Sequence, residues 1–439
     1  MVRFLLALTA LAFTALAQTA PYNFNEAKIP PYTLPDPLTL SNGLKVTDSK
    51  TWLEKRRPEL LALFADQVYG HGPAESAPLR ASEVFTDRKA LNGKAIRKQV
   101  TLYFTEDNAG PQMHVLLYLP AAAKSPSPVF VALSFNGNHT VDKDPGIAAN
   151  EVWLRDPNDI SGSPNRKWVH LLPDDRTRGQ FAANWQVEKL LDRGYGLAVV
   201  YYYDIEPDFV GGMQYGVRPL LVRDPDSWSA LGAWAWGLSR TVDWLFTDRA
   251  VDQRRIALMG HSRLGKAALW AAAQDPRFAL VVSNESGKGG ASLLKRGYGE
   301  TTDHLNTAFP HWFGPNYKQY TGHPEKLPVD GHELLALIAP RPLYVASAVD
   351  DQGSDPKGEF LSAVNAGKVY QLFGKKGLGV TLMPLPDQPV MHDIGYHVRT
   401  GKHDVTAFDW DQYLAFADLH WGANQTPKPA PAKPETRRP

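Results

Sequence analysis

Apolar runs of strand length alternate with helical segments through most of this chain. The runs that predict buried strands are 129–135, 197–203, 255–259, 279–283, 342–347 and 379–383. The segments that predict helices are 228–245, 267–273 and 409–420. Such alternation is typical of an α/β fold, in which a mostly parallel sheet carries helices on both faces as a three-layer sandwich. In sheets of this kind, sites lie beyond the carboxyl ends of the strands.

The two ends of the chain differ from this pattern. Arg3 precedes an apolar stretch at 4–16, and Ala15-Leu16-Ala17 forms an A-x-A cleavage site, so residues 1–17 read as a signal peptide. The stretch is too short to span a membrane. Residues 18 to about 45 predict an extended arm, and the Pro- and Lys-rich 424–439 predict a disordered tail. We therefore expect one catalytic domain over 18–423 in a secreted or periplasmic protein.

The amino-acid composition excludes some kinds of chemistry and some classes of partner. The 439 residues are 43% hydrophobic and 21% charged, which suits a large globular domain. There is no cysteine, which excludes disulfides, thiolate catalysis and cysteine-bound zinc, and with an export signal favours a bacterial source. The net charge of +1 gives no indication of nucleic acid or anionic membrane as a partner. We expect a monomer without a cofactor.

The turn at 260–266 is the most informative motif, and it reads Gly-His-Ser-Arg-Leu-Gly-Lys. It follows an apolar strand and precedes a helix, which is the context of the nucleophile elbow of α/β-hydrolases. Ser262 would then point out at the carboxyl edge of the sheet. The second glycine is Gly265 rather than residue 264, so the pattern is G-x-S-R-x-G-K. The alternative is that Ser262 only caps the helix.

A serine nucleophile needs a base, and the base needs an acid to orient it. Two acids follow predicted strands, Glu285 and Asp351, and by strand position Asp351 holds the commoner place. Either carboxylate could instead be a solvated loop residue.

Three histidines, His392, His397 and His403, follow the last predicted strand. His403 directly precedes the final helix, where the base of this fold belongs, and His392 is its competitor. A lone histidine is more often a structural hydrogen-bonding residue. The histidines lack the i, i+4 pairing of a helical zinc site, so we expect no metal.

Arg263 follows the serine directly. Its N–H is an expected oxyanion donor, and its guanidinium would add positive charge where an oxyanion develops. The alternative is a surface arginine, although a helix N-terminus is an unfavourable place for a cation.

Together these motifs resemble the glucuronoyl esterases of carbohydrate esterase family 15, over most of residues 30–421. The elbow matches the family's G-x-S-R-x-G-K signature, and 284–290 (Asn-Glu-Ser-Gly-Lys-Gly-Gly) matches its second motif. The segment 395–403 is similar to the end region of bacterial members. The resemblance implies Ser262 as nucleophile, His403 as base and Glu285 as triad acid. Asp351 matches an extra acidic position of many bacterial members.

The resemblance also implies a substrate. The family cleaves esters between 4-O-methyl-glucuronic acid side chains of xylan and lignin alcohols. Lys266 matches a lysine that contacts the sugar, and Glu300 falls where bacterial members carry a sugar-binding glutamate. One departure is Gly353, which stands where many members have a tryptophan that packs on the sugar.

Other functions stay open at this point. A xylan acetyl esterase of the same fold is the first alternative to a glucuronoyl esterase. A carbohydrate-binding or scaffold protein built on an inactive hydrolase fold is the second, and the presence of Ser262, His403 and an acid disfavours it.

Overall fold

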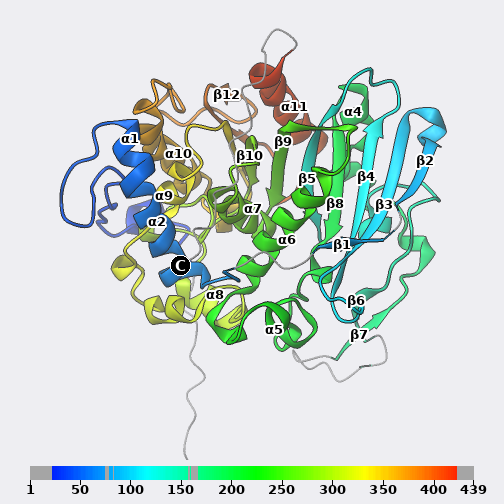
Figure 1. Ribbon diagram of the computed structural model, residues 1–439. Coiled ribbons are helices and arrows are strands. Elements are labelled where there is room, and N and C mark those ends of the chain that lie inside the picture. The colour runs from blue at the N-terminus through cyan, green and yellow to red at the C-terminus, as the bar shows by residue number, and fades with distance from the viewer. Residues whose placement is uncertain (1–21, 75–78, 83, 157–158, 160–166, 423–439) are drawn as a thin grey trace, which may run out of the picture.

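The computed structural model describes residues 22–74, 79–82, 84–156, 159 and 167–422 (Figure 1). Its centre is an 11-stranded sheet in the order β1-β3-β4-β8-β5-β9-β10-β11-β13-β12, with β2 paired to β3. Six neighbouring strands are parallel. They are β8 Gly196–Tyr201, β5 Ser127–Ser134, β9 Val251–His261, β10 Leu280–Asn284, β11 Leu343–Ala348 and β13 Ile394–Arg399. The predicted parallel sheet is confirmed in this central part.

Antiparallel strands extend the sheet at both edges. At one edge they are β1 Arg80–Ala81, β2 Phe85–Ala90, β3 Ala95–Tyr103 and β4 Gln112–Pro120, and at the other β12 Val390–Met391. A separate two-stranded sheet pairs β6 Val152–Arg155 with β7 Trp168–Leu171. Figure 1 shows this small sheet below the β2–β4 edge of the large one.

Helices cover both faces of the large sheet, as the sequence predicted. Along β5, Val129 and Val131 pack into one core with α6, α7 and α10, whereas Phe130 and Ala132 pack into another with α4 and α11. This alternation follows from the two-residue period of a strand. The longest of these helices are α6 Ala230–Leu245, α7 Arg263–Gln274, α10 Pro356–Gln371 and α11 Ala407–Trp421. The others are α1 Ser49–Thr51, α2 Arg57–Phe64, α3 Ala182–Trp185, α4 Val187–Asp192, α5 Arg218–Leu221, α8 Thr302–Ala308 and α9 Gly331–Ala336.

The strand predicted at 379–383 is wrong. These residues form a loop in which Gly379 has a φ of +73° and Leu382 is 83% exposed. The last parallel strand is β13 instead, whose six residues are all buried. The segment 379–383 is mostly apolar in sequence, which suggested a strand. Gly374, Gly377 and Gly379 have left-handed backbone conformations, and they turn the chain away from the sheet.

The register brings the carboxyl ends of four strands together. Asn284 of β10 pairs with His261 of β9 and with Ala346 of β11, and Ala348 of β11 pairs with Arg399 of β13. The residues that directly follow these strands therefore meet at one edge of the sheet, which is where the sequence placed the site.

The predicted signal peptide 1–17 and tail 424–439 lie outside the described residues. The start of the described chain follows the domain surface, with a 3-10 turn at Glu26–Lys28 and isolated bridges from Asn23 to Gly299 and from Thr39 to Lys45. Among the helices of the described residues, none has the length and apolarity needed to cross a membrane.

Candidate active site

Ser262 lies in a tight turn between β9 and α7. Its backbone has φ 57° and ψ −132°, a conformation that residues other than glycine rarely adopt. Its N–H donates to the Asn284 carbonyl at 2.9 Å, which ties the turn to β10. A Cβ at Gly260 would lie 2.2 Å from the Leu264 carbonyl oxygen, so glycine is needed for the helix to approach the strand this closely. The geometry is that of a nucleophile elbow.

His403 meets both candidate acids with the same ring nitrogen. Its Nδ1 lies 2.7 Å from Asp351 Oδ2 and 3.0 Å from Glu285 Oε2. Glu285 directly follows β10 and is fully buried with a φ of +46°, whereas Asp351 begins the turn after β11. The structure thus brings together the two acids between which the sequence could not choose.

The pKa values of these three groups reflect their mutual contacts. Burial alone would lower the pKa of His403, but hydrogen bonds to Asp351 and Glu285 and their negative charges raise it to about 10. Burial raises the pKa of Glu285 to about 7, against the opposing effects of His403 and Arg399. Burial also acts on Asp351, but its contact with His403 prevails and its pKa is lowered. Asp351 therefore keeps its negative charge to lower pH than Glu285 does.

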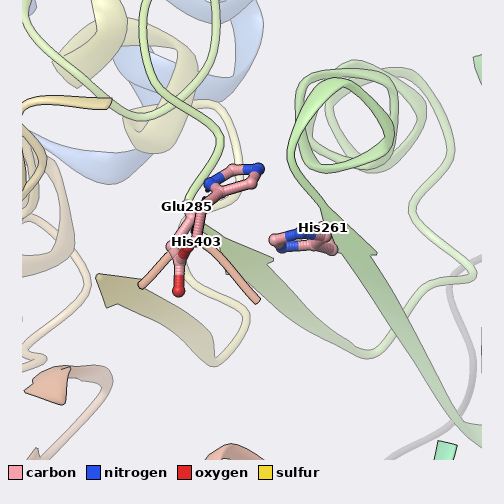
Figure 2. Close-up of side chains that lie close together, drawn as sticks. All are labelled: His261, Glu285 and His403. Atoms are coloured by element: carbon pink, nitrogen blue, oxygen red, sulfur yellow. Dashed lines mark ion pairs between the residues drawn. The ribbon is translucent and has the colours of Figure 1, made fainter. Parts of the chain in front are cut away.

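His261 is the residue before the serine, and its ring faces the other side of His403 (Figure 2). The two imidazole centroids are 4.4 Å apart, and His261 Nδ1 lies 2.9 Å from the Asn284 side-chain oxygen. Burial and the nearby His403 lower the pKa of His261 to about 3. His261 is therefore a neutral ring that packs on the imidazole of His403.

A cavity of about 310 Å³ opens beside these residues. Ser262, His261, Arg263 and His403 line it together with aromatic side chains, which are Phe135, Phe181, Trp185 and Trp410. A cavity with an apolar wall and a few convergent polar groups is typical of a small-molecule site.

Arg263 is the first residue of α7, so its N–H belongs to the helix N-terminus, where backbone donors lack partners within the helix. Its guanidinium donates to Asp208 Oδ2 at 2.5 Å and lies 4.6 Å from the centre of the Trp312 ring. Ion pair and aromatic contact hold a partly exposed cation at the start of the helix, which the alternative of a free surface arginine does not explain.

The two residues predicted to contact sugar differ in accessibility. Lys266 is only 3% exposed, and its ammonium donates to the carbonyl oxygens of Ser286 at 2.6 Å and Lys288 at 2.7 Å. It also lies 3.4 Å from Glu300 Oε2. The Glu300 side chain is more accessible, at 21% exposed, so Glu300 can reach a sugar while the buried Lys266 orients Glu300 and the 286–288 loop.

The other two candidate histidines lie away from the serine. His397 is fully buried on β13, with Nε2 2.9 Å from Asp409 Oδ1 and Nδ1 3.0 Å from the Tyr344 hydroxyl. The ring of His392 packs beside Gly379, and its carbonyl lies 3.0 Å from His420 Nε2. Both have the structural environment that the sequence analysis considered for a lone histidine.

Within the described residues, His261, Glu285 and His403 form a group whose possible ligand atoms lie within 4.8 Å of one another. These side chains already share hydrogen bonds: His261 Nδ1 with Asn284, and the Glu285 oxygens with Arg399 and His403. A proton on His403 also opposes metal binding. The donor set suits a hydrogen-bonded triad better than a metal centre.

Two residues of the site were missed by the sequence analysis. Asp208 follows β8 and its 3-10 turn, and accepts hydrogen bonds from Arg263, Trp312 and Tyr202. Arg399 ends β13 and donates to Glu285 Oε1 at 2.6 Å. The position of Asp208, beyond the carboxyl end of the strand predicted at 197–203, was an available signal. Arg399 had no such signal, because β13 was not among the predicted strands.

Comparison with known proteins agrees with this geometry. A family model described as glucuronyl esterase of fungi matches residues 221–374. A carbohydrate esterase from an unknown prokaryotic organism is 46% identical over 412 residues, which cover 92% of this chain and 93% of that protein. A 4-O-methyl-glucuronoyl methylesterase of Wolfiporia cocos is 28% identical over 78% of this chain and 72% of its own length.

Solved structures extend the likeness to three dimensions. A glucuronoyl esterase from Solibacter usitatus is 52% identical, with a TM-score of 0.85 over 90% of this chain and 100% of that one. The chain therefore belongs to the glucuronoyl esterases of carbohydrate esterase family 15, and it is a carboxylic ester hydrolase with the α/β-hydrolase fold.

Proposed function

We propose that this protein is a serine esterase that hydrolyses esters of glucuronic acid or 4-O-methyl-glucuronic acid, such as those that link xylan to lignin. The observation that carries the proposal is the junction at His403. Its Nδ1 is held by Glu285 and Asp351, and its ring lines the same cavity as Ser262 in the elbow. This arrangement supplies a nucleophile, a base and an orienting acid for acyl transfer.

The reaction proceeds through an acyl-enzyme. Ser262 Oγ attacks the ester carbonyl carbon while His403 Nε2 takes the hydroxyl proton. The tetrahedral intermediate collapses, the C–O bond to the alcohol breaks, and His403 returns the proton to the leaving alcohol. Water then attacks the acyl-enzyme with the same help from His403, and releases the uronic acid and free Ser262. The two carboxylates hold the imidazole in one tautomer and stabilise the imidazolium that forms.

Arg263 stabilises the oxyanion. Its N–H lies at the start of α7, and its guanidinium sits beside the cavity that contains Ser262. Preorganised donors of this kind are worth about 10²–10³ in kcat each. Because Asp208 and Trp312 hold the guanidinium, little rearrangement is needed when charge develops.

The sugar is recognised on the Glu300 side of the site. The Glu300 carboxylate is held by Lys266 and by the Lys288 N–H at 3.3 Å, and it can accept hydrogen bonds from sugar hydroxyls. Position 353 is open: a Cβ at Gly353 would meet only Asp351 Oδ1, at 3.7 Å. A sugar bound here lacks an aromatic ring from that position to pack on, and uses Glu300 and the cavity wall instead.

Purified protein should hydrolyse benzyl glucuronate, and Ser262→Ala should lower kcat by several orders of magnitude. His403→Ala should resemble Ser262→Ala, whereas His392→Ala is the matched control and should keep activity. Acetylated xylan tests the alternative activity: faster release of acetate than of benzyl alcohol would replace the proposal with a xylan acetyl esterase. Loss of activity on treatment with a chelator, restored by zinc or calcium, would contradict the expectation that the enzyme needs no metal.

We further propose that residues 1–17 direct export and are removed before Gln18. N-terminal sequencing of the protein secreted by a bacterial host should begin at Gln18. A mature protein that retains Met1 contradicts this part of the proposal.

A further inference from the structure

Arg399, the last residue of β13, lies behind the acid side of the site and is used by none of the steps above. Its side chain is 3% exposed. The guanidinium Nη2 lies 2.6 Å from Glu285 Oε1 and 2.7 Å from the main-chain carbonyls of both Lys402 and Asp404. One buried cation thus contacts the triad acid and the peptide groups on both sides of His403.

The same loop is also bonded to the acid from the other side. The Asp404 N–H donates to Glu285 Oε2 at 3.1 Å, next to the contact of that oxygen with His403 Nδ1. Arg399 therefore takes one carboxylate oxygen of Glu285 and leaves the other for the imidazole. A closed ring of contacts joins Arg399, Glu285 and the His403 loop, which restricts both the acid and the base.

Arg399 is itself held in place by a buried chain of hydrogen bonds. Its Nε donates to Asp409 Oδ2 at 2.9 Å, and the other oxygen of Asp409 lies 2.9 Å from His397 Nε2. The Tyr344 hydroxyl then lies 3.0 Å from His397 Nδ1. Asp409 also closes the capping box of α11 with Thr406. This chain fixes the direction of the guanidinium and explains why His397 is buried without contacting the cavity.

We propose that Arg399 is a positioning residue for the reaction: it holds the His403 loop against Glu285 and so fixes the imidazole toward Ser262. The proposal rests on the proposed function of Ser262, His403 and Glu285. A buried arginine that only neutralised Glu285 and Asp409 would need no contact with the carbonyls that flank His403. Those two contacts distinguish positioning from charge balance.

The fork geometry of arginine makes a conservative variant informative. Lysine keeps the positive charge, but one ammonium cannot reach Asp409, Glu285 and the loop carbonyls together. Arg399→Lys should therefore lower kcat for benzyl glucuronate by about tenfold to hundredfold, because a small misplacement of a catalytic group lowers the rate by factors of this size. KM should stay within about twofold, because Glu300, Arg263 and the cavity are unchanged.

Double variants test whether Arg399 affects kcat through Glu285. If Arg399 acts through Glu285, Arg399→Lys should change kcat little in a Glu285→Gln background. In an Asp351→Asn background, where Glu285 is the remaining acid, Arg399→Lys should lower kcat by a larger factor than it does in the wild type. Equal losses in all three backgrounds would overturn the proposal.

The matched control is Arg341→Lys. The Arg341 guanidinium also donates to main-chain carbonyls, of Ala272, Asp275 and Phe278, but outside the site. This variant should lower the thermal midpoint without changing kcat. If Arg399→Lys does not fold, Asp409→Asn decides the question. A lower kcat at unchanged KM supports the proposal, and wild-type kcat in a folded Asp409→Asn protein overturns it.

A readout without substrate separates this proposal from the proposed function. The His403 Nδ1 proton, shared with two carboxylates, should give a downfield imidazole resonance in proton NMR, identified by its loss in His403→Ala. Arg399→Lys should shift or broaden it, and Arg341→Lys should not. An unchanged resonance in Arg399→Lys contradicts the positioning role. A wild-type protein that shows the resonance but does not hydrolyse uronate esters contradicts the proposed function instead.

Discussion

Asp208 and Glu285 are two buried carboxylates that each receive an arginine, yet their surroundings give them opposite properties. Asp208 accepts from the Arg263 guanidinium at 2.5 Å, the Trp312 indole at 2.6 Å and the Tyr202 hydroxyl at 3.0 Å. His311 Nε2 lies 2.8 Å away as well. Burial would raise the pKa of Asp208, but the His311 contact and the charge on Arg263 lower it to about 2.

Glu285 has a comparable number of donors, but it shares its histidine with a second carboxylate. Burial raises its pKa to about 7, and the negative charge of Asp351 acts in the same direction. Asp208 is therefore a fixed anion that anchors Arg263, whereas Glu285 is a carboxylate close to protonation at neutral pH. At Asp208 the contacts with His311, Arg263 and Trp312 outweigh burial and make an anchor, whereas at Glu285 burial outweighs His403 and Arg399 and makes a group that titrates near neutral pH.

Among the single substitutions that test this contrast, Arg263→Met should lower kcat the most. It removes an oxyanion donor, so kcat for benzyl glucuronate should fall about 10²–10³-fold. It also leaves Asp208 buried without its cation, so the free energy of unfolding should fall. The double variant Arg263→Met with Asp208→Asn should recover part of that stability, measured by urea unfolding, but none of the lost kcat. Recovery of kcat in the double variant would show that Arg263 contributes only to folding.

Glu285→Gln and Asp351→Asn test the shared acid. Each carboxylate can orient the imidazole when the other is lost, so each single variant should lower kcat less than Ser262→Ala does. The double variant should lower kcat more than either, because the imidazole then lacks any carboxylate partner. Steady-state kinetics at one pH with benzyl glucuronate measures all three. If Asp351→Asn matches the wild type while Glu285→Gln is inactive, the two acids do not share the role.

The difference between these regions also explains what the sequence could and could not predict. The elbow around Ser262 depends on neighbouring residues, since a strand, two glycines and a helix determine its shape. The candidate acids and base could be identified from the order of strands and helices along the chain, which gave Glu285, Asp351 and His403. The choice between the two acids depends on side-chain geometry, and the structure places both on one nitrogen.

Asp208 and Arg399 belong to the part that could not be predicted. Asp208 meets Arg263 across 55 positions of sequence, and Arg399 meets Glu285 across 114. Nothing local marks either residue as buried, because their neighbours include ordinary loop residues. The same limit explains the misassigned strand at 379–383, where Leu382 is exposed and Val380 and Met383 only pack against the edge of the core.

The pH dependence of kcat/KM should separate the two acids further. His403 must be neutral to accept a proton. The charges that face it come from Glu285 and Asp351, and the third group that faces it, His261, is neutral. Since the carboxylates raise the pKa of His403 to about 10, kcat/KM should rise with pH above neutrality. Asp351→Asn removes one raising charge, so the rise should move to lower pH. A profile that moves to higher pH, or stays in place, would contradict the contact between Asp351 and His403.

Asp208→Asn should have the smallest effect of these substitutions. The effect should be visible in how the free energy of unfolding depends on pH. The folded pKa of about 2 lies below the usual aspartate value of 3.8, so the Asp208 carboxylate stabilises the fold above about pH 4. That contribution, on the order of 2 kcal/mol, is lost as the pH falls toward 2. Urea unfolding should therefore show a free-energy gap between the wild type and Asp208→Asn that is largest above pH 4 and shrinks below it. Asp226→Asn, at an exposed position before α6, is the matched control and should show no such gap. A gap that stays constant from pH 5 to pH 3 would mean that Asp208 is no stronger an acid in the folded protein than in the unfolded chain, and the contrast with Glu285 would then rest on Glu285 alone.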